Sequence, residues 1–517
     1  MSDAGFLNLV LFLPVIGAAL LFPMRDEGRM RALSLAVMLV QFALAAMLYQ
    51  RFDANDPGLQ FVTRLPWIVD WGVYYHIGLD GMNVLLVLLT AFLGPLVVAG
   101  AFTAITKDVK LFYAMVFLIQ FTMVGTLVAQ DLFLFYLFWE AMMIPMFLII
   151  GIWGGERRVY ATLKFVLYTA FGSILMLAAV IYLVVVLSGS TGVTSFAFAD
   201  LYKAELTLPV QTVLLAAFAL SFAIKVPVVP LHTWLPDAHV EAPTAGSVIL
   251  AGVLLKMGTY GFLKLGFPLF PDATRLAAPI IMALAVLSIV YGACLALVQT
   301  DIKKIIAYSS ISHLGYVMLG LISLDLIGIQ GAIVQMVSHG LTAAGLFLMV
   351  GMIYERCHTR ELGAYGGLAK VLPLYSVFFM ILTLASIGLP TTSGFTGEFL
   401  VLLGAFGPSW QAAAQGDTLR LALAVAAVGG VVLGALYMLR FAGRFLFGAV
   451  KVPHGTQADL GFRESAILVA IVVPIFWLGL FPAEPLRKTE LAAKAYQQLV
   501  TTLRIPDAAK VAREDPR

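Results

Sequence analysis

The sequence predicts an all-helical membrane protein that crosses a bilayer many times. Hydrophobic residues make up 61% of its 517 positions and charged residues only 12%, against roughly 45–50% and 25% in soluble proteins. The mean hydropathy is +0.97, and a soluble globule could not bury so much apolar surface. The apolar runs are continuous, unlike the short alternating strands of a membrane barrel. Because a segment in lipid must satisfy its own backbone hydrogen bonds, we expect these runs to be helices.

Fourteen apolar runs approach the length of about 20 residues that a transmembrane helix needs. The predicted spans cover residues 5–23, 32–50, 82–103, 111–130, 132–152, 163–187, 209–229, 244–265, 277–298, 305–323, 327–353, 374–404, 419–446 and 462–481. The first run is expected to be a span and not a cleaved signal peptide. No basic residue precedes it, and no small-residue cleavage site lies between it and Arg25.

The segment 51–80 is predicted to stay outside the bilayer. It contains two prolines, two tryptophans and two tyrosines, and aromatic residues in such a segment usually anchor a protein at the membrane interface. We expect an outward-facing hairpin here. The polar tail that begins at Ala483 is also expected to face outward, with a surface helix over residues 490–503.

The basic residues predict the orientation of the spans. Loops after odd-numbered spans hold sixteen Lys and Arg residues, with Lys303 among them. Loops after even-numbered spans hold six, among which we count Lys264 at the end of the eighth span. Cytoplasmic loops carry the excess of basic residues. The odd-numbered loops are therefore predicted to be cytoplasmic, and with fourteen spans both termini face outward. The net charge of +3 is too small to indicate binding to nucleic acid.

Six ionisable residues fall inside the predicted spans, where a charge at the bilayer centre costs roughly 2.5–3.5 kcal/mol on insertion scales. They are Glu140, Lys225, Lys256, His313, His339 and Glu398. Lys164 lies near a span end, where a lysine can extend its ammonium group to the interface. We therefore expect a function for the six but not for Lys164.

A proton relay is the chemistry that suits these residues. A buried lysine releases its proton more readily, and a nearby carboxylate reverses that effect. A Glu140–Lys225 pair that opens and closes would thus switch the lysine between holding and releasing a proton, and histidine titrates near neutrality without help. The alternative is that the charges only pin helices together and that each histidine is an ordinary hydrogen-bonded core residue.

No motif in the sequence indicates a cofactor or metal bound by this chain. There is no phosphate-binding glycine motif of the kinds that hold ATP, flavin or nicotinamide. Cys294 and Cys357 are 63 residues apart and are expected to be inert thiols. His232 and His239 share a loop with two carboxylates, but their spacing is not that of a closed metal site.

Two predicted spans are interrupted by similar motifs, which suggests an internal repeat. The motifs are Ala223-Ile-Lys-Val-Pro227 and Ser386-Ile-Gly-Leu-Pro390, and their prolines are 163 residues apart. Paired breaks in two halves of a membrane protein are typical of inverted repeats around a transport site. We predict two inverted five-helix repeats, each with a broken helix, at residues 111–265 and 277–446. The segment 1–110 before them holds the first three spans and the hairpin. The segment 447–517 after them holds the last span and the tail.

Two long runs resemble the antiporter-like, proton-conducting subunits of respiratory complex I. They are Pro230-LHTWLPDAHVEAP-Thr244 and Asp301-IKKIIAYSSISHL-Gly315, and the resemblance covers essentially the whole chain. Two of the three subunits in that family typically carry lysine after the twelfth-span break, where this chain has Glu398. In this respect the chain looks like the M-type subunit, the counterpart of mitochondrial chain 4.

The resemblance implies roles and partners. Glu140 would be the partner of Lys225, Lys256 the central relay lysine, His313 and His339 its continuation, and Glu398 the distal end. The chain would be a subunit of an enzyme that oxidises NADH with quinone and pumps protons outward from a bacterial inner membrane. Flavin, iron–sulfur clusters and quinone would bind other subunits, and the partners would be lipid and membrane subunits, including antiporter-like ones on both sides. The alternatives are a subunit of a multisubunit sodium/proton antiporter and a scaffold subunit that conducts nothing.

Overall fold

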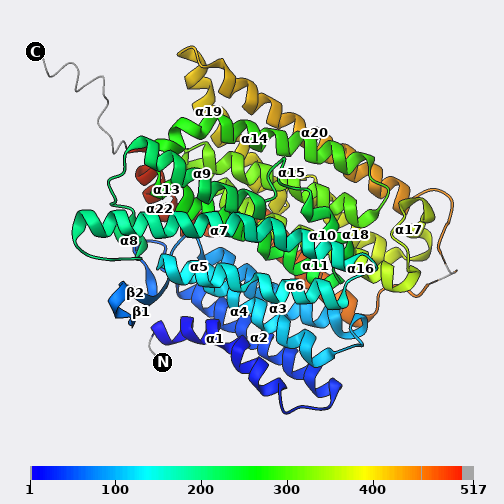
Figure 1. The fold of residues 1–517 in the computed structure, drawn as a ribbon. Helices are drawn as coiled ribbons and strands as arrows, with labels where there is room; N and C mark the ends of the chain where they lie inside the picture. The colour runs from blue at the N-terminus through cyan, green and yellow to red at the C-terminus, as the bar shows by residue number, and fades with distance from the viewer. Residues whose placement is uncertain (1–2, 454, 456, 503–517) are drawn as a thin grey trace, which may run out of the picture.

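Long helices run side by side through the molecule in parallel and antiparallel directions (Figure 1). The structure is a computed structural model that describes residues 3–453, 455 and 457–502. In chain order, its helices and strands are α1 (Asp3–Leu21), α2 (Glu27–Arg51), β1 (Gln60–Ile68), β2 (Val73–Leu79), α3 (Val84–Ala104), α4 (Val109–Val128), α5 (Leu132–Ala141), α6 (Met143–Trp153), α7 (Arg158–Thr191), α8 (Phe198–Leu201), α9 (Leu208–Lys225), α10 (Trp234–Glu241), α11 (Thr244–Ile249), α12 (Leu255–Gly261), α13 (Phe267–Leu269), α14 (Pro271–Val298), α15 (Ile302–Ile322), α16 (Leu326–Cys357), α17 (Leu368–Val371), α18 (Pro373–Ser386), α19 (Ser393–Ala414), α20 (Thr418–Leu446), α21 (Phe462–Leu480) and α22 (Ala483–Thr501).

The predicted all-helical, many-span architecture is confirmed. Among the described residues, twelve helices are long and apolar enough to cross a membrane. Two shorter apolar helices, Gly5–Leu21 and Pro373–Ser386, lie where the first and twelfth spans were predicted. The total of fourteen stays a prediction, because both are shorter than the roughly 20 residues that a span needs.

Three spanning segments are interrupted, two of them as predicted. One break separates α9 from α10 and another separates α18 from α19, each at a predicted proline motif. The third break separates α5 from α6 and was not predicted. Pro145, in the first turn of α6, has no N–H to donate to the carbonyl of Ala141, which explains why α5 ends there. This break leaves Glu140 in the last turn of α5.

The eighth predicted span is the central element of the bundle. It runs from Thr244 to Leu269 as α11, α12 and α13, and its most apolar stretch is wholly buried. Two wider π-helical turns, Leu250–Leu254 and Phe262–Gly266, flank α12. Such turns are rare and are frequent at functional sites. Lys256 lies in α12, directly after the first of them.

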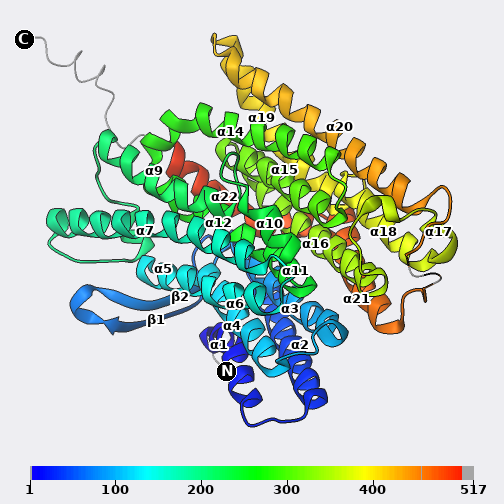
Figure 2. The same cartoon turned by 45° about the vertical axis from the view of Figure 1, so that its right-hand side comes forward.

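The predicted hairpin is present as β1 and β2, which pair antiparallel with Leu65 opposite Tyr75. It is fastened to α1, because Asn8 donates to Thr63 Oγ1 over 2.7 Å and Tyr75 OH donates to Asn8 Oδ1 over 2.6 Å. The hairpin, α8, α13 and α22 gather at one end of the bundle, and α17 lies at the opposite end (Figure 1). The hairpin and α17 are also at opposite ends in the turned view (Figure 2). Which end faces the cytoplasm stays a prediction.

The predicted surface helix of the tail needs a correction. It begins at Ala483 and not at residue 490, and one face of α22 packs against α14 and α16. Lys488 on that face is buried, and its ammonium donates to the carbonyl oxygens of Tyr49 and Phe52 over 2.8 and 2.9 Å. The rest of the predicted tail, residues 503–517, lies outside the described residues.

Lys264 also departs from the prediction, which placed it in an outer loop. It is buried and forms an ion pair with Asp80, which is also buried. Asp80 additionally accepts hydrogen bonds from the backbone N–H groups of Met82 and Asn83, at the start of α3. The pair thus ties the central segment to the junction of the hairpin and α3.

We expect Asp80→Asn to destabilise the protein by about 3 kcal/mol, because it leaves the buried ammonium of Lys264 without its counter-charge. The amide oxygen can still accept the two backbone hydrogen bonds. The loss of stability therefore measures the effect of removing the charge of Asp80. Thermal unfolding of the protein in detergent measures it. Adding Lys264→Met should restore part of the stability, and a double variant as unstable as the single one would contradict this explanation.

Candidate functional site

The structure places the six predicted residues in two clusters inside the bundle. Lys256, His339, His313 and Glu398 follow one another as a chain of neighbours, and Glu140 and Lys225 line a separate small cavity. All six except Glu140, which is half-buried, are almost inaccessible to solvent. Residues from six helices that are far apart in the sequence are therefore brought into the interior.

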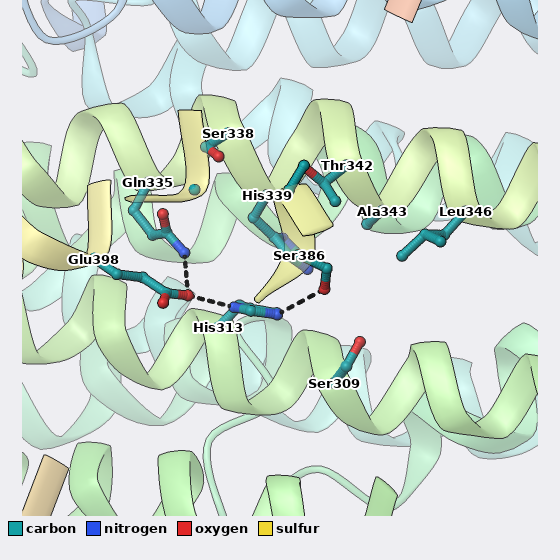
Figure 3. Close-up of a pocket in the computed structure, with 12 residues that line it drawn as sticks. Ser309, His313, Gln335, Ser338, His339, Thr342, Ala343, Leu346, Ser386 and Glu398 are labelled. Carbon is teal, nitrogen blue, oxygen red and sulfur yellow. Dashed lines mark hydrogen bonds and ion pairs between the residues drawn. The ribbon is translucent and has the colours of Figure 1, made fainter. Parts of the chain in front are cut away.

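The row of four side chains, from Lys256 to Glu398, has short contacts at both ends. Lys256 Nζ lies 2.7 Å from His339 Nδ1, and His313 Nδ1 lies 2.8 Å from Glu398 Oε1. In the middle, the two imidazole rings are 5.6 Å apart between centroids. The four side chains come from α12, α16, α15 and α19, and Figure 3 shows the histidine–glutamate end of the chain.

Neutral polar residues that the sequence did not single out complete this end. Gln335 donates to Glu398 Oε1 over 3.1 Å, and the hydroxyl group of Ser386 lies 3.4 Å from His313 Nε2 (Figure 3). The hydroxyl group of Tyr437 lies 3.5 Å from the same nitrogen. Ser386 is the last residue of α18 and opens the second predicted break motif. The signal that marks all three is a hydrogen-bonding side chain within an otherwise apolar span.

A glycine allows α19 to approach α16 at this point. A Cβ atom on Gly397 would lie 2.3 Å from Gln335 Oε1 and 2.8 Å from the Gln335 backbone. No real side chain fits that space, so only glycine lets Gln335 reach Glu398 on the next residue of α19. Gly397, which follows the second predicted break, thus has a packing role.

Lys256 is fully buried and has two partners. Besides His339, its ammonium donates to the carbonyl oxygen of Ala251, which lies in the first π-helical turn. The other ring nitrogen of His339, Nε2, has no hydrogen-bond partner among the described residues. A small cavity, about the size of one water molecule, is lined by both histidines and by Glu398.

The predicted Glu140–Lys225 ion pair is not closed in the described structure. Lys225 Nζ instead lies 3.6 Å from the centre of the Trp139 ring and 3.4 Å from the Trp139 carbonyl oxygen. Glu140 Oε1 is buried without a hydrogen-bond partner, yet its charge is close enough to act on Lys225. Cation–π attraction to Trp139 holds the ammonium, and the indole is fixed by donating to Ser173 Oγ over 3.0 Å.

Lys164, which was predicted to reach toward the interface, forms an ion pair. Its ammonium lies 2.7 Å from Asp237 Oδ2, and both side chains are about one-quarter exposed. The ion pair ties α7 to α10 at the break after α9. Lys164 is therefore a structural contact, and no contact connects it to the two clusters.

The segment that contains His232 and His239 forms α10 and the turn before it. In the described part of the chain, no three His, Cys, Asp or Glu side chains come together as a metal site would require. Cys294 is exposed and Cys357 is buried, and each is a free thiol. His239 is nevertheless fully buried, and so is Lys303, which was expected in an inner loop and donates to the carbonyl of Ala242 over 2.6 Å.

Comparisons with known proteins agree with this architecture. A family model described as "NADH:quinone oxidoreductase/Mrp antiporter, TM" matches residues 129–419. Subunit M of NADH-quinone oxidoreductase from Rhodobacter capsulatus is 44% identical over 495 residues, which are 93% of this chain and 94% of that protein. The matched region contains both clusters.

Solved structures are similar to nearly the whole chain. A chain of respiratory complex I from Thermus thermophilus with bound NADH superposes with a TM-score of 0.85 at 33% identity, over 96% of this chain and all of that one. A chain of the Mrp complex from Dietzia sp. DQ12-45-1b gives a TM-score of 0.83 at 23% identity, over 97% of this chain and all of that one. The second similarity concerns the fold alone.

Proposed function

We propose that this chain, which belongs to the subunit M family of NADH-quinone oxidoreductase, moves protons across the membrane through its buried relay. The reaction that drives it, NADH oxidation by quinone, takes place in other subunits, which hold flavin, iron–sulfur clusters and quinone. One observation carries the proposal: Lys256, His339, His313 and Glu398 form a chain of proton-carrying groups in an apolar interior.

Each end of this chain supports a direct proton transfer. Donor and acceptor must come within hydrogen-bond distance for such a step, and both Lys256–His339 and His313–Glu398 satisfy this. The step between the histidines needs a bridge, because no hydrogen bond links the rings among the described residues. The small cavity that both histidines line has room for one water molecule to act as that bridge.

Glu140 and Lys225 act as the switch in this proposal. With Lys225 on Trp139, the Oε1 atom of Glu140 has no hydrogen-bond partner among the described residues. Closing the ion pair would stabilise the ammonium and withdraw its charge from the neighbouring lysine of the relay. Opening it would have the opposite effect, because charges interact strongly where water is excluded. The open arrangement is one of the two states that a switch needs.

The division into two inverted repeats, at 111–265 and 277–446, is part of the same proposal. The segments 1–110 and 447–517 flank them. It is supported by the placement of the clusters, since each lies beside a broken helix. Lys225 is the last residue of α9, and Ser386, which contacts His313, is the last residue of α18.

We propose a bacterial inner membrane as the location, with the hairpin, α22 and both termini on the outer side. Other membrane subunits of the enzyme, including antiporter-like subunits on both sides, and lipid are the proposed partners. The alternative, a subunit of a sodium/proton antiporter, is weaker, because the Mrp match is 23% identical whereas the subunit M match is 44% identical. Proton pumping that follows NADH oxidation in sodium-free medium would distinguish the two.

We expect Glu140→Gln to assemble normally but to slow NADH-driven proton translocation at least tenfold, as loss of an acid–base group typically does. The amide has nearly the same volume, so packing survives, but it cannot compensate the charge of Lys225. Proton uptake by inside-out membrane vesicles measures the effect. The matched control is Glu156→Gln, since Glu156 is exposed in the loop after α6. Wild-type translocation in the Glu140 variant would refute the switch.

A further inference from the structure

The side chain of Trp139 is held from several directions beside Lys225. The indole is buried and stacks on Phe135 with ring centroids 5.7 Å apart. It also packs edge-to-face with Phe222 at a centroid distance of 5.3 Å. Its N–H donates to Ser173 Oγ over 3.0 Å, and the ammonium of Lys225 lies over the ring, 3.6 Å from its centre. These contacts hold the indole in the orientation that receives the ammonium.

The helix that anchors the indole packs closely against the helix that carries the lysine. Ser173 lies in α7, and Lys225 is the last residue of α9. A Cβ atom on Gly172 would lie 2.9 Å from Ser221 Cα and 3.0 Å from Ile224 Cδ1, both in α9. A side chain there would push the two helices apart, right beside the indole anchor. The glycine thus helps to fix the distance between the ring and the lysine.

Two partners for the ammonium line the same small cavity. Trp139, Glu140 and Lys225 all face this space, which is about the size of one water molecule. Since a lysine side chain is long and flexible, the ammonium has room to move from the ring to the carboxylate. An isolated ammonium in an apolar interior is very costly. Lys225 can therefore leave Glu140 only if another group stabilises its charge.

We propose that the aromatic face of Trp139 is the second binding position of the Lys225 ammonium, and that its attraction sets how often the switch is open. Tryptophan attracts a cation more strongly than any other aromatic side chain. It carries no charge and exchanges no proton, so it can hold the ammonium without entering the relay. Trp139 is thus a positioning residue that acts through Lys225. This inference rests on the proposed function and names the group that holds the switch open.

Fluorine atoms on the indole test this attraction while leaving the packing nearly unchanged. Each fluorine withdraws electrons from the ring and weakens its attraction for a cation, yet it is only slightly larger than hydrogen. Tryptophan analogues with one to four fluorine atoms are incorporated at position 139 of the whole complex, and NADH-driven proton uptake by inside-out vesicles is measured per assembled complex. We expect translocation to fall with each added fluorine, and by about tenfold with four, because the closed ion pair becomes favoured.

The matched control is the same series of analogues at Trp153, the last residue of α6. The indole of Trp153 also donates a hydrogen bond, to the carbonyl oxygen of Lys107 over 2.7 Å. None of the described cations that lie over an aromatic ring lies over Trp153. Translocation should therefore not depend on the number of fluorine atoms at this position.

A compensating pair of substitutions is the second test, and it uses natural amino acids. Trp139→Phe keeps an aromatic ring but attracts the ammonium more weakly, so it should slow translocation by favouring the closed ion pair. Glu140→Asp shortens the carboxylate and weakens that ion pair. Adding Glu140→Asp to Trp139→Phe should therefore raise translocation several-fold above that of Trp139→Phe alone. Two purely structural defects would not compensate each other in this way.

Two results would overturn the inference: translocation within twofold of wild type with four fluorine atoms at position 139, or a double variant no faster than Trp139→Phe. Glu140→Gln in the same vesicles keeps the two proposals apart. If it slows translocation while the fluorine series has no effect, the switch stands and Trp139 only fills space. If Glu140→Gln translocates like wild type, the switch itself is wrong.

Discussion

Lys256→Ala is expected to abolish nearly all NADH-driven proton translocation, with a loss on the order of a hundredfold or more. Lys256 is fully buried at the centre of the bundle and contacts both His339 Nδ1 and the carbonyl of Ala251. No other described lysine contacts His339, so the alanine variant lacks the first proton carrier of the proposed relay. Proton uptake by inside-out vesicles, normalised to assembled complex, measures the loss.

Two companion variants make this result interpretable. Lys256→Met keeps most of the side-chain volume, so it should be as inactive as Lys256→Ala if the lysine carries protons, but close to wild type if it only fills space. Lys164→Ala removes an ion pair with Asp237 that is partly exposed, which is worth about 1 kcal/mol or less. Translocation in this variant should stay near the wild-type rate. Equal activities for Lys256→Ala and Lys164→Ala would show that burial does not distinguish the two lysines.

The sequence predicts which charged residues are buried because lipid makes charge so costly. Glu140, Lys225, Lys256 and Glu398 stand out in apolar runs for that reason alone, and the structure buries them as expected, Glu140 partially. The two proline motifs likewise predict the breaks after α9 and α18, since proline removes a backbone hydrogen bond wherever it occurs inside a helix. Both signals are local properties of the chain and need no knowledge of how the helices pack.

Contacts between helices are what the sequence could not supply. The ammonium of Lys225 lies on the ring of Trp139 and not against the carboxylate of Glu140. Trp139 and Glu140 are adjacent in the sequence, so sequence position alone could not tell which of them Lys225 contacts. Lys264 and Lys303 lie at the ends of predicted spans, where hydropathy assigns lysine to a loop, yet packing buries both. The burial of His239 likewise depends on what surrounds α10, and no local pattern reports that.

Glu398 is the distal end of the proposed relay, and its variants are expected to differ according to whether they can hold a proton. Its Oε1 atom lies 2.8 Å from His313 Nδ1 and accepts a hydrogen bond from Gln335 Nε2, so it is placed to exchange a proton with His313. Glu398→Ala holds no proton and removes both hydrogen bonds, and we expect it to lose translocation on the order of a hundredfold. Glu398→Gln keeps the shape but cannot accept the proton, so it should be nearly as inactive.

Glu398→Lys is expected to keep part of the translocation, because lysine can hold and release a proton from the opposite charge state. The site can accommodate it: Gln335 Oε1 is buried without a partner among the described residues, so it can accept a hydrogen bond from the new ammonium group. Release outward against the membrane potential costs about 2.3 kcal/mol per 100 mV for a full crossing, which the redox reaction must supply in either case. Redox-driven pumping in vesicles should therefore rank wild type above Glu398→Lys, and Glu398→Lys above Glu398→Gln and Glu398→Ala. If Glu398→Gln instead pumps like wild type, the carboxylate only positions His313 and Gln335. The proton must then pass from His313 to the outside by another route.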